Sequence, residues 1–203
     1  MEFLGRLSRK IGDNLVQSNI INAEDAEIYI YGINQILVSI LNVSSALIIG
    51  LIFGVFFEIA VFMAAYIPLR TFAGGYHART PLRCYIFSVI MLIVVSLGLK
   101  YLSVTEWVYY AVLALSAIVV FVLSPVEDKN KPLDKIEHRV YKKRAVIIAA
   151  AEIAASVVFK LTGLNSLFAA VVYSFAVLCF MLVLGMVKNR FGNSIGEENC
   201  SIN

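Results

Sequence analysis

Long runs of apolar residues, separated by short polar connections, are the feature that most limits how this chain can fold. Hydrophobic residues make up 60% of the 203 positions and charged residues only 15%, and the mean hydropathy is +0.83. Soluble domains average roughly 45–50% apolar and about 25% charged residues. A water-soluble core of this length could not cover so much apolar surface. The sequence therefore predicts an all-α integral membrane protein.

A helix that crosses a bilayer needs about 20 mainly apolar residues. Six candidate spans follow: residues 28–54, 55–68, 82–99, 107–123, 145–159 and 167–187. The second span is short, so four or five spans are the alternative if the chain near Gly54 re-enters the membrane instead of turning tightly. No repeat or low-complexity linker divides the chain. We therefore expect a single polytopic domain over residues 1–203.

The first 20 residues lack the continuous apolar core of a signal peptide but have the periodicity of a helix. One face carries Phe3, Leu4, Leu7, Ile11 and Leu15, and the other carries Arg6, Arg9, Lys10, Asp13 and Gln17. Such a basic amphipathic helix is typical of a membrane surface, and packing on the protein's own core is the alternative. Asn22 is predicted to cap the helix that follows.

Lysine and arginine are unevenly distributed among the connections, which predicts the orientation in the membrane. With the N-terminus inside, the N-terminal helix, residues 69–83, residues 124–144 and the C-terminal tail hold three, three, seven and two of the 17 Lys and Arg residues. Cytoplasmic connections are enriched in these residues. Both termini are therefore predicted to be cytoplasmic. The net charge of +3 is then mainly a topology signal, and nucleic acid is not an expected partner.

The longest polar connection, residues 124–144, has two interpretations. Pro125 and Pro132 break it into turns, and residues 133–144 are predicted to form a short interfacial helix. The simpler interpretation is a solvated, positively charged loop. The more specific one is a surface that contacts an acidic partner or anionic lipid headgroups.

Few side chains inside the predicted spans are ionisable or able to bind a metal. Glu58 and Glu152 are acids within the membrane, where carboxyl groups point to function unless the helix bundle satisfies them. Two isolated acids give little support to a proton pump or an ion-coupled transporter. The cysteines Cys84, Cys179 and Cys200 show no CxxC spacing, and there are only two histidines. No metal or other cofactor is therefore expected.

The segment from Arg70 to Cys84, RTFAGGYHARTPLRC, interrupts the apolar runs with a polar and basic connection. Thr80 and Pro81 predict the start of a helix, which places Cys84 in its first turn. There the positive end of the helix dipole favours a thiolate. His77 precedes the helix on a connection that can fold back toward the sulfur. A Cys–His pair suits peptidase or acyl-transfer chemistry, and a purely structural cysteine and histidine are the alternative.

This segment resembles the signature of the AgrB (accessory gene regulator protein B) family. These are membrane cysteine endopeptidases of quorum sensing in Gram-positive bacteria. A second stretch, SPVEDKNKPL at residues 124–133, is similar to the family's proline-bracketed cytoplasmic loop. The resemblance covers almost the whole chain and implies that Cys84 is the nucleophile and His77 the general base, at the cytoplasmic face of the cell membrane.

The resemblance also implies a substrate, a small AgrD-like propeptide whose acidic C-terminal part is cleaved off. The acyl-enzyme would then cyclise to a thiolactone or lactone autoinducing peptide. Substrate contacts are expected from Arg70, Arg79, Lys129 and Lys131, and oxyanion contacts from the N–H groups of Gly74 and Gly75. Glu127, Asp128 and Asp134 are candidates for orienting His77. A small bundle with a shielded site is compatible with a homodimer. A peptide exporter or a non-catalytic membrane scaffold is the alternative function.

Overall fold

The computed structural model describes residues 2–76, 80–127 and 134–198. Helices dominate these residues, and the only pairing of β type among them is one isolated bridge. In chain order the elements are α1 (Glu2–Gln17), the 3-10 helix η1 (Ala23–Asp25), α2 (Ala26–Phe53), α3 (Phe56–Ala73), α4 (Pro81–Tyr101), α5 (Glu106–Leu123), α6 (Lys135–Leu161) and α7 (Asn165–Glu198). The predicted all-α class is confirmed.

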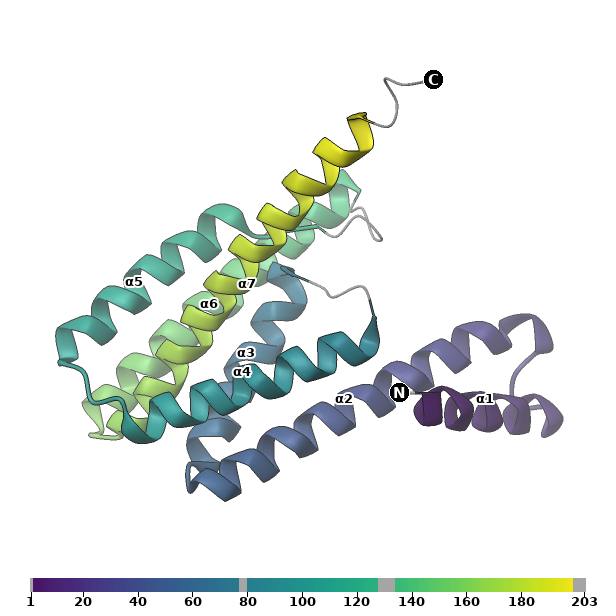
Figure 1. Cartoon of the computed structure of the whole chain (residues 1–203), viewed down its shortest axis with the longest axis horizontal. Helices are drawn as coiled ribbons and strands as arrows, with labels where there is room; N and C mark the ends of the chain where they lie inside the picture. Colours follow the sequence, from purple (N-terminus) through teal and green to yellow (C-terminus); the bar gives the residue numbers. More distant parts are fainter. Residues whose placement is uncertain (1, 77–79, 128–133, 199–203) are drawn as a thin grey trace.

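Five helices in the described part of the chain are long and apolar enough to cross a membrane: α2, α3, α4, α5 and α7. The fifth predicted span, residues 145–159, lies in α6, which is not among the five. Charged residues fill the first turns of α6, and Glu152 and Lys160 interrupt its apolar part. Figure 1 shows that α2 to α7 nevertheless alternate in direction between two ends of one bundle. The fold is that of an all-α membrane protein with five candidate spans, where the sequence predicted six.

Helix α3 extends further than the sequence predicted. The second span was expected to end at Pro68, and a proline in a helix interior lacks the N–H that its turn would use. The helix instead continues to Ala73, and the side chains of Leu69 and Ala73 beyond the proline are fully buried. Packing thus sustains the last turns of α3. As a result Arg70 lies in a helix, and the polar connection shrinks from residues 69–83 to residues 74–80.

Two further helix boundaries also differ from the prediction. The short interfacial helix predicted over residues 133–144 is not separate, because its described part from Lys135 belongs to α6, which runs unbroken to Leu161. Asp134 and Glu137 form a capping box at this start, in which Glu137 Oε2 accepts a hydrogen bond of 3.1 Å from the Asp134 N–H. Asn22 precedes only the 3-10 turn and makes no capping bond through its side chain.

The predicted amphipathic helix at the N-terminus is α1, and it packs against α2. Ser8 and Gly12 face this contact: Ser8 is buried, and a Cβ atom on Gly12 would clash with the side chain of Ile30. Phe3, by contrast, is 73% exposed. Small residues of α1 therefore approach α2 closely, while part of its apolar face remains uncovered.

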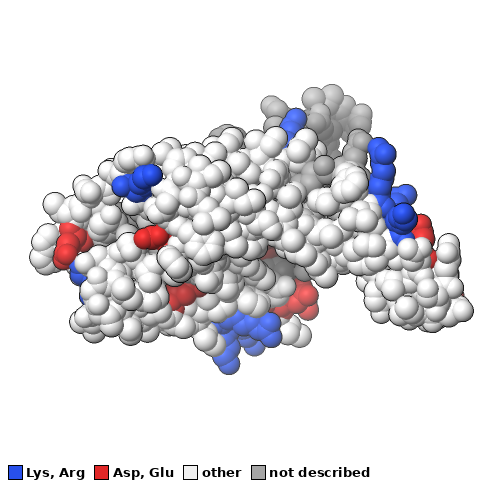
Figure 2. All heavy atoms as spheres, turned by 90° about the horizontal axis from the view of Figure 1, so that it is seen from below, with Lys and Arg blue, Asp and Glu red and all other residues white. Residues whose placement is uncertain are grey.

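Helix α7 is the most buried candidate span, and α3, α5 and α6 pack around it. Its side chains Phe175, Leu178 and Leu182 are fully buried. In Figure 1, α1 and the first half of α2 project to the right of this bundle. Figure 2 shows large areas free of charge, with Lys and Arg gathered in separate groups, one of them toward the end where α1 lies. Uncharged surface of this extent is what lipid contact requires.

At the bundle end away from α1, a polar cluster joins three helices. Lys160 Nζ lies 2.6 Å from Glu106 Oε1 and 2.9 Å from Asn165 Oδ1. The hydrogen bond to Glu106 raises the pKa of Lys160. This ion pair connects α6 to the start of α5, and Asn165 begins α7. The two loops at this end are thereby held together.

Candidate functional site

Cys84 lies in the first turn of α4, where the sequence predicted the start of a helix. Thr80 is extended, and its side chain accepts a hydrogen bond of 3.4 Å from the N–H of Arg83. Pro81 occupies the first helical position. The N–H of Cys84 donates to the carbonyl oxygen of Thr80 at 3.1 Å. A capping oxygen and a proline of fixed φ together start a helix. Cys84 follows as a free, half-buried thiol.

We expect Thr80→Ala to weaken the start of α4 without unfolding the protein. Loss of an N-cap costs about 0.5–2 kcal/mol, and each kcal/mol lowers the melting temperature of a domain this size by about 2–4 °C. Thermal unfolding of the detergent-solubilised protein would measure the effect. Thr80→Ser keeps the capping oxygen and should unfold at the wild-type temperature. An equal drop in both variants would show that the cap is not the cause.

The connection between α3 and α4 is joined to the loop after α5 by backbone hydrogen bonds. The N–H of Val126 donates to the carbonyl oxygen of Ala73 at 2.9 Å, and the N–H of Gly75 donates to the carbonyl oxygen of Val126 at 3.3 Å. This is the isolated parallel bridge between Gly74 and Val126. Gly74 has a φ of 75°, and a Cβ atom there would overlap the Val126 carbonyl. Glycine is therefore needed for both its conformation and its lack of a side chain.

Helix α7 supports the same connection from another side. The N–H of Tyr76 donates to the carbonyl oxygen of Met181 at 2.9 Å. Gly185, one turn further along α7, faces the connection so closely that a Cβ atom would lie 2.9 Å from both Gly75 C and Tyr76 N. Lys188 Nζ lies 5.4 Å from the centre of the Tyr76 ring. The chain just before His77 thus rests directly on α7.

Arg70, near the end of α3, holds the connection by hydrogen bonds from its side chain. Its guanidinium donates to the carbonyl oxygens of Tyr76 and of Gly74, the latter at 3.4 Å. The same guanidinium lies 5.9 Å from the centre of the Tyr66 ring. Tyr66 itself is buried. Arg70 therefore holds the connection and the buried tyrosine together beside the start of α4.

These contacts change how two of the sequence predictions are interpreted. Arg70 was expected to bind an acidic substrate, but here its donors go to backbone carbonyl oxygens. Gly74 and Gly75 were expected to offer N–H groups to an oxyanion. Here the Gly74 N–H donates to the Arg70 carbonyl oxygen at 3.0 Å and the Gly75 N–H to Val126. An oxyanion would have to displace these bonds, and the visible role of both glycines is conformational.

Five of the predicted site residues lie outside the described part of the chain: His77, Arg79, Asp128, Lys129 and Lys131. The pairing of His77 with Cys84 therefore stays a prediction. Tyr76, directly before His77, lies on the connection that α7 supports, and its ring centroid is 5.9 Å from that of Phe87 on α4. The described part of the chain contains no group of three His, Cys, Asp or Glu residues that could hold a metal ion.

Three residues that shape this site were not predicted from the sequence. Val126 supplies both backbone partners of the bridge, Met181 accepts from Tyr76, and Gly185 makes room for the connection. Only Gly185 carries a local signal, because a glycine within an otherwise apolar helix indicates close approach of another backbone. The contacts of Val126 and Met181 use backbone groups that almost every residue has, so residue type does not predict them.

Comparison with known proteins agrees with the resemblance seen in the sequence. The family model for Accessory gene regulator B matches residues 8–184. A protein of Listeria monocytogenes serotype 4a (strain HCC23) described as AgrB-like is 25% identical over 145 residues, which cover 70% of this chain and 71% of that protein. A protein of Clostridium perfringens (strain SM101 / Type A), also described as AgrB-like, is 26% identical over 134 residues, covering 63% and 61%.

No solved structure matches this chain significantly. The family model nevertheless spans most of the sequence, from α1 to the part of α7 that contains Met181. It includes Cys84, the connection before it and the bridge at Val126. The chain therefore belongs to the Accessory gene regulator B family, as a membrane protein of quorum sensing.

Proposed function

We propose that this protein is a cysteine endopeptidase that cleaves a small AgrD-like propeptide at the membrane. The observation that carries the proposal is the position of Cys84 in the first turn of α4, beside a connection that α3, α7 and the loop after α5 hold in place. A nucleophile needs a fixed position relative to its base and substrate. Membership of the AgrB family supports an AgrD-like propeptide as the substrate.

In the first step, the sulfur of Cys84 attacks the carbonyl carbon of the scissile peptide bond. A carbon–sulfur bond forms, the carbon–nitrogen bond breaks, and the N-terminal part of the propeptide remains as a thioester on Cys84. His77 accepts the thiol proton and passes it to the departing amine, as a general base and then a general acid. The acidic C-terminal part leaves with a new amino terminus.

In the second step, a cysteine or serine within the bound peptide attacks the thioester carbonyl. The new bond closes a thiolactone or lactone ring, and Cys84 is released as a thiol. An internal nucleophile has a high effective concentration, which favours cyclisation over hydrolysis. Water must be scarce near the thioester for the same reason. A site at the membrane boundary meets this requirement.

Basic residues in the connections that are predicted to be cytoplasmic would bind the acidic part of the propeptide. Arg79, Lys129 and Lys131 belong to the two polar connections, and the first turns of α6 add exposed cations, among them Arg139 and Lys143. The excess of Lys and Arg in these connections supports a cytoplasmic site. The same cations would contact anionic lipid headgroups.

The proposal is tested by trapping the thioester on Cys84. The full chain would be co-expressed with a short peptide encoded next to its gene that has a central Cys or Ser and an acidic tail, and both would be analysed by mass spectrometry. We expect propeptide cleavage and an acyl adduct on Cys84. Both should be lost in Cys84→Ala and His77→Ala, because each removes a group that acts in the first step.

Cys179→Ala is the matched control, because Cys179 is the other free cysteine in the described residues and lies in α7. It should cleave at the wild-type rate. Normal cleavage by Cys84→Ala would refute the endopeptidase assignment. Export of the peptide without any cleavage would favour a transporter instead.

A further inference from the structure

A cavity between α2, α3 and α4 lies one helical turn from Cys84. Ser88 lines it, and Ser88 Oγ donates to the carbonyl oxygen of Cys84 at 3.0 Å. Tyr66 lines the same cavity. Four residues of α-helix rise about 6 Å. A side chain of a peptide held at the Cys84 sulfur can therefore extend into this cavity.

The size of the cavity suits a single side chain. Its volume is about 190 Å³. Sites for whole small molecules usually measure about 300–1,000 Å³. The cavity is smaller than this range, so it would not hold such a molecule. Met63 and Met91 lie in its wall. Methionine side chains are flexible and adapt to occupants of different shape.

The lining of the cavity defines the chemistry of its occupant. Most of the wall is apolar, and none of the described residues that form it is charged. A charged side chain would lose its hydration there without gaining a partner. Ser39 Oγ and Asn42 Nδ2 donate to carbonyl oxygens of their own helix, which leaves the lone pairs of their side-chain oxygens as acceptors. The cavity thus suits a neutral, mainly apolar side chain attached to a backbone with N–H donors.

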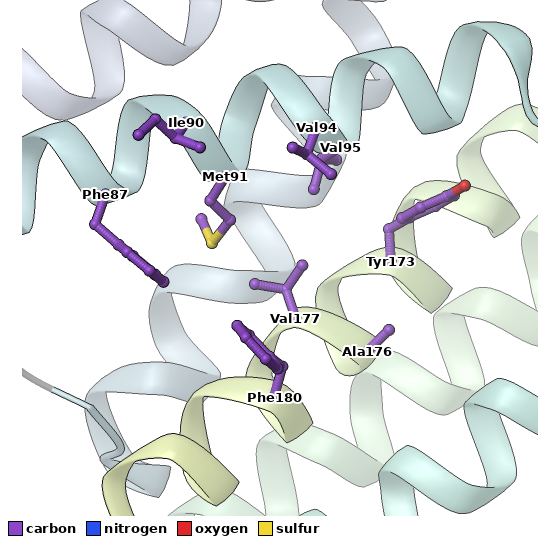
Figure 3. Close-up of a pocket in the computed structure, with 9 residues that line it drawn as sticks. All are labelled: Phe87, Ile90, Met91, Val94, Val95, Tyr173, Ala176, Val177 and Phe180. Carbon is purple, nitrogen blue, oxygen red and sulfur yellow. The ribbon is translucent and has the colours of Figure 1, made fainter. Parts of the chain in front are cut away.

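A second cavity on the other side of α4 differs in this respect. Figure 3 shows the apolar side chains of α4 and α7 that line it, with Tyr173 as the residue carrying a polar atom. Its volume is about 400 Å³. Lipid acyl chains match such a surface as well as any peptide side chain does. The polar groups of Ser39, Asn42, Tyr66 and Ser88 distinguish the cavity between α2, α3 and α4 from this lipid-like surface.

We propose that the cavity lined by Ser39, Asn42, Met63, Tyr66, Ser88 and Met91 binds the side chain of the propeptide residue whose carbonyl group is transferred to Cys84. This inference rests on the proposed endopeptidase function. It adds a specificity: the acyl residue is neutral and apolar, and glycine or an acidic residue at that position reacts poorly.

The experiment uses simple acyl donors in place of the propeptide. N-acetyl amino acid p-nitrophenyl esters of Gly, Leu, Met, Phe and Asp would be mixed with the purified full chain in lipid nanodiscs. Cys84 displaces p-nitrophenolate and becomes acylated, and mass spectrometry identifies the modified cysteine. Each rate is divided by the rate of the same ester with N-acetylcysteine, which removes differences in intrinsic reactivity. We expect the Leu, Met and Phe esters to exceed the Gly ester by about tenfold or more.

Two neighbouring variants test whether the cavity causes this preference. Ser39→Phe fills the cavity from an exposed position of α2 and should abolish the advantage of the large esters over the Gly ester. Ile40→Phe adds a ring to the adjacent residue, which is 57% exposed and does not line the cavity, and should retain the wild-type preference.

Three results would overturn the inference, and one of them separates it from the proposed function. Equal rates for all esters in the wild type would refute the cavity's role. Equal behaviour of the Ser39 and Ile40 variants would do so as well. If iodoacetamide alkylates Cys84 but no ester acylates it, the endopeptidase function itself fails, and the inference fails with it.

Discussion

Gly185→Ala is expected to reduce propeptide processing by about tenfold to a hundredfold while the chain still inserts and folds. The added Cβ atom would lie 2.9 Å from both Gly75 C and Tyr76 N, so α7 or the connection must move. A displacement near 1 Å at a catalytic site costs about a hundredfold in rate. Overpacking of this kind costs about 1–3 kcal/mol, which most folded proteins tolerate. Cleavage of the co-expressed propeptide, followed by mass spectrometry, measures the loss.

Gly32→Ala is the matched control for this variant. Gly32 also lies within a helix, but a Cβ atom there would meet no other atom within 4 Å. Alanine favours helix over glycine, so processing and membrane insertion should stay at wild-type levels. A comparable loss in both variants would mean that helix glycines matter for some reason other than contact with the connection.

Arg70→Lys is expected to lower processing by at least about tenfold although it keeps the positive charge. The guanidinium of Arg70 reaches two carbonyl oxygens of the connection at once and lies over the ring of Tyr66. A lysine ammonium is a compact point charge and cannot reproduce this planar fork. The connection should therefore lose the hydrogen bonds that hold it to the end of α3. Arg9→Lys, an exposed exchange in α1, should have no effect.

The same variant separates two roles for Arg70. If Arg70 holds the connection, acylation of Cys84 by an uncharged p-nitrophenyl ester should fall as much as propeptide cleavage does. If Arg70 instead binds the acidic part of the propeptide, the ester should react at the wild-type rate and only the KM for the propeptide should change. The second pattern would contradict the role that we assign from the hydrogen bonds.

Features set by local chemistry were predicted well. The start of α4 follows from Thr80 and Pro81, whose capping oxygen and fixed φ act within one turn. The amphipathic α1 follows from its periodicity. The predicted end of the second span at Pro68 was wrong, because burial of Leu69 and Ala73 outweighs the one hydrogen bond that the proline cannot make. That energy comes from tertiary packing, which a single segment does not reveal.

The candidate site was predicted only in part for a related reason. Cys84 and the glycine pair could be proposed from the sequence because a cysteine can act as a nucleophile and glycine permits the turn. The sequence could not show that Val126 and Met181 hold the connection, since both act through carbonyl oxygens that every residue has. Whether His77 reaches the sulfur of Cys84 stays a prediction.

The contact between Tyr76 and Met181 also sets an order of assembly during synthesis. Cys84 and its connection emerge from the ribosome long before α7, because chains are made from the N-terminus onward. Until α7 enters the membrane, Tyr76 lacks its acceptor and the connection lacks the surface around Gly185. A chain still being translated therefore carries Cys84 without the surroundings that this cysteine has in the complete fold. Under the proposed function, Cys84 would therefore be ready for acyl transfer only after the last helix is in place.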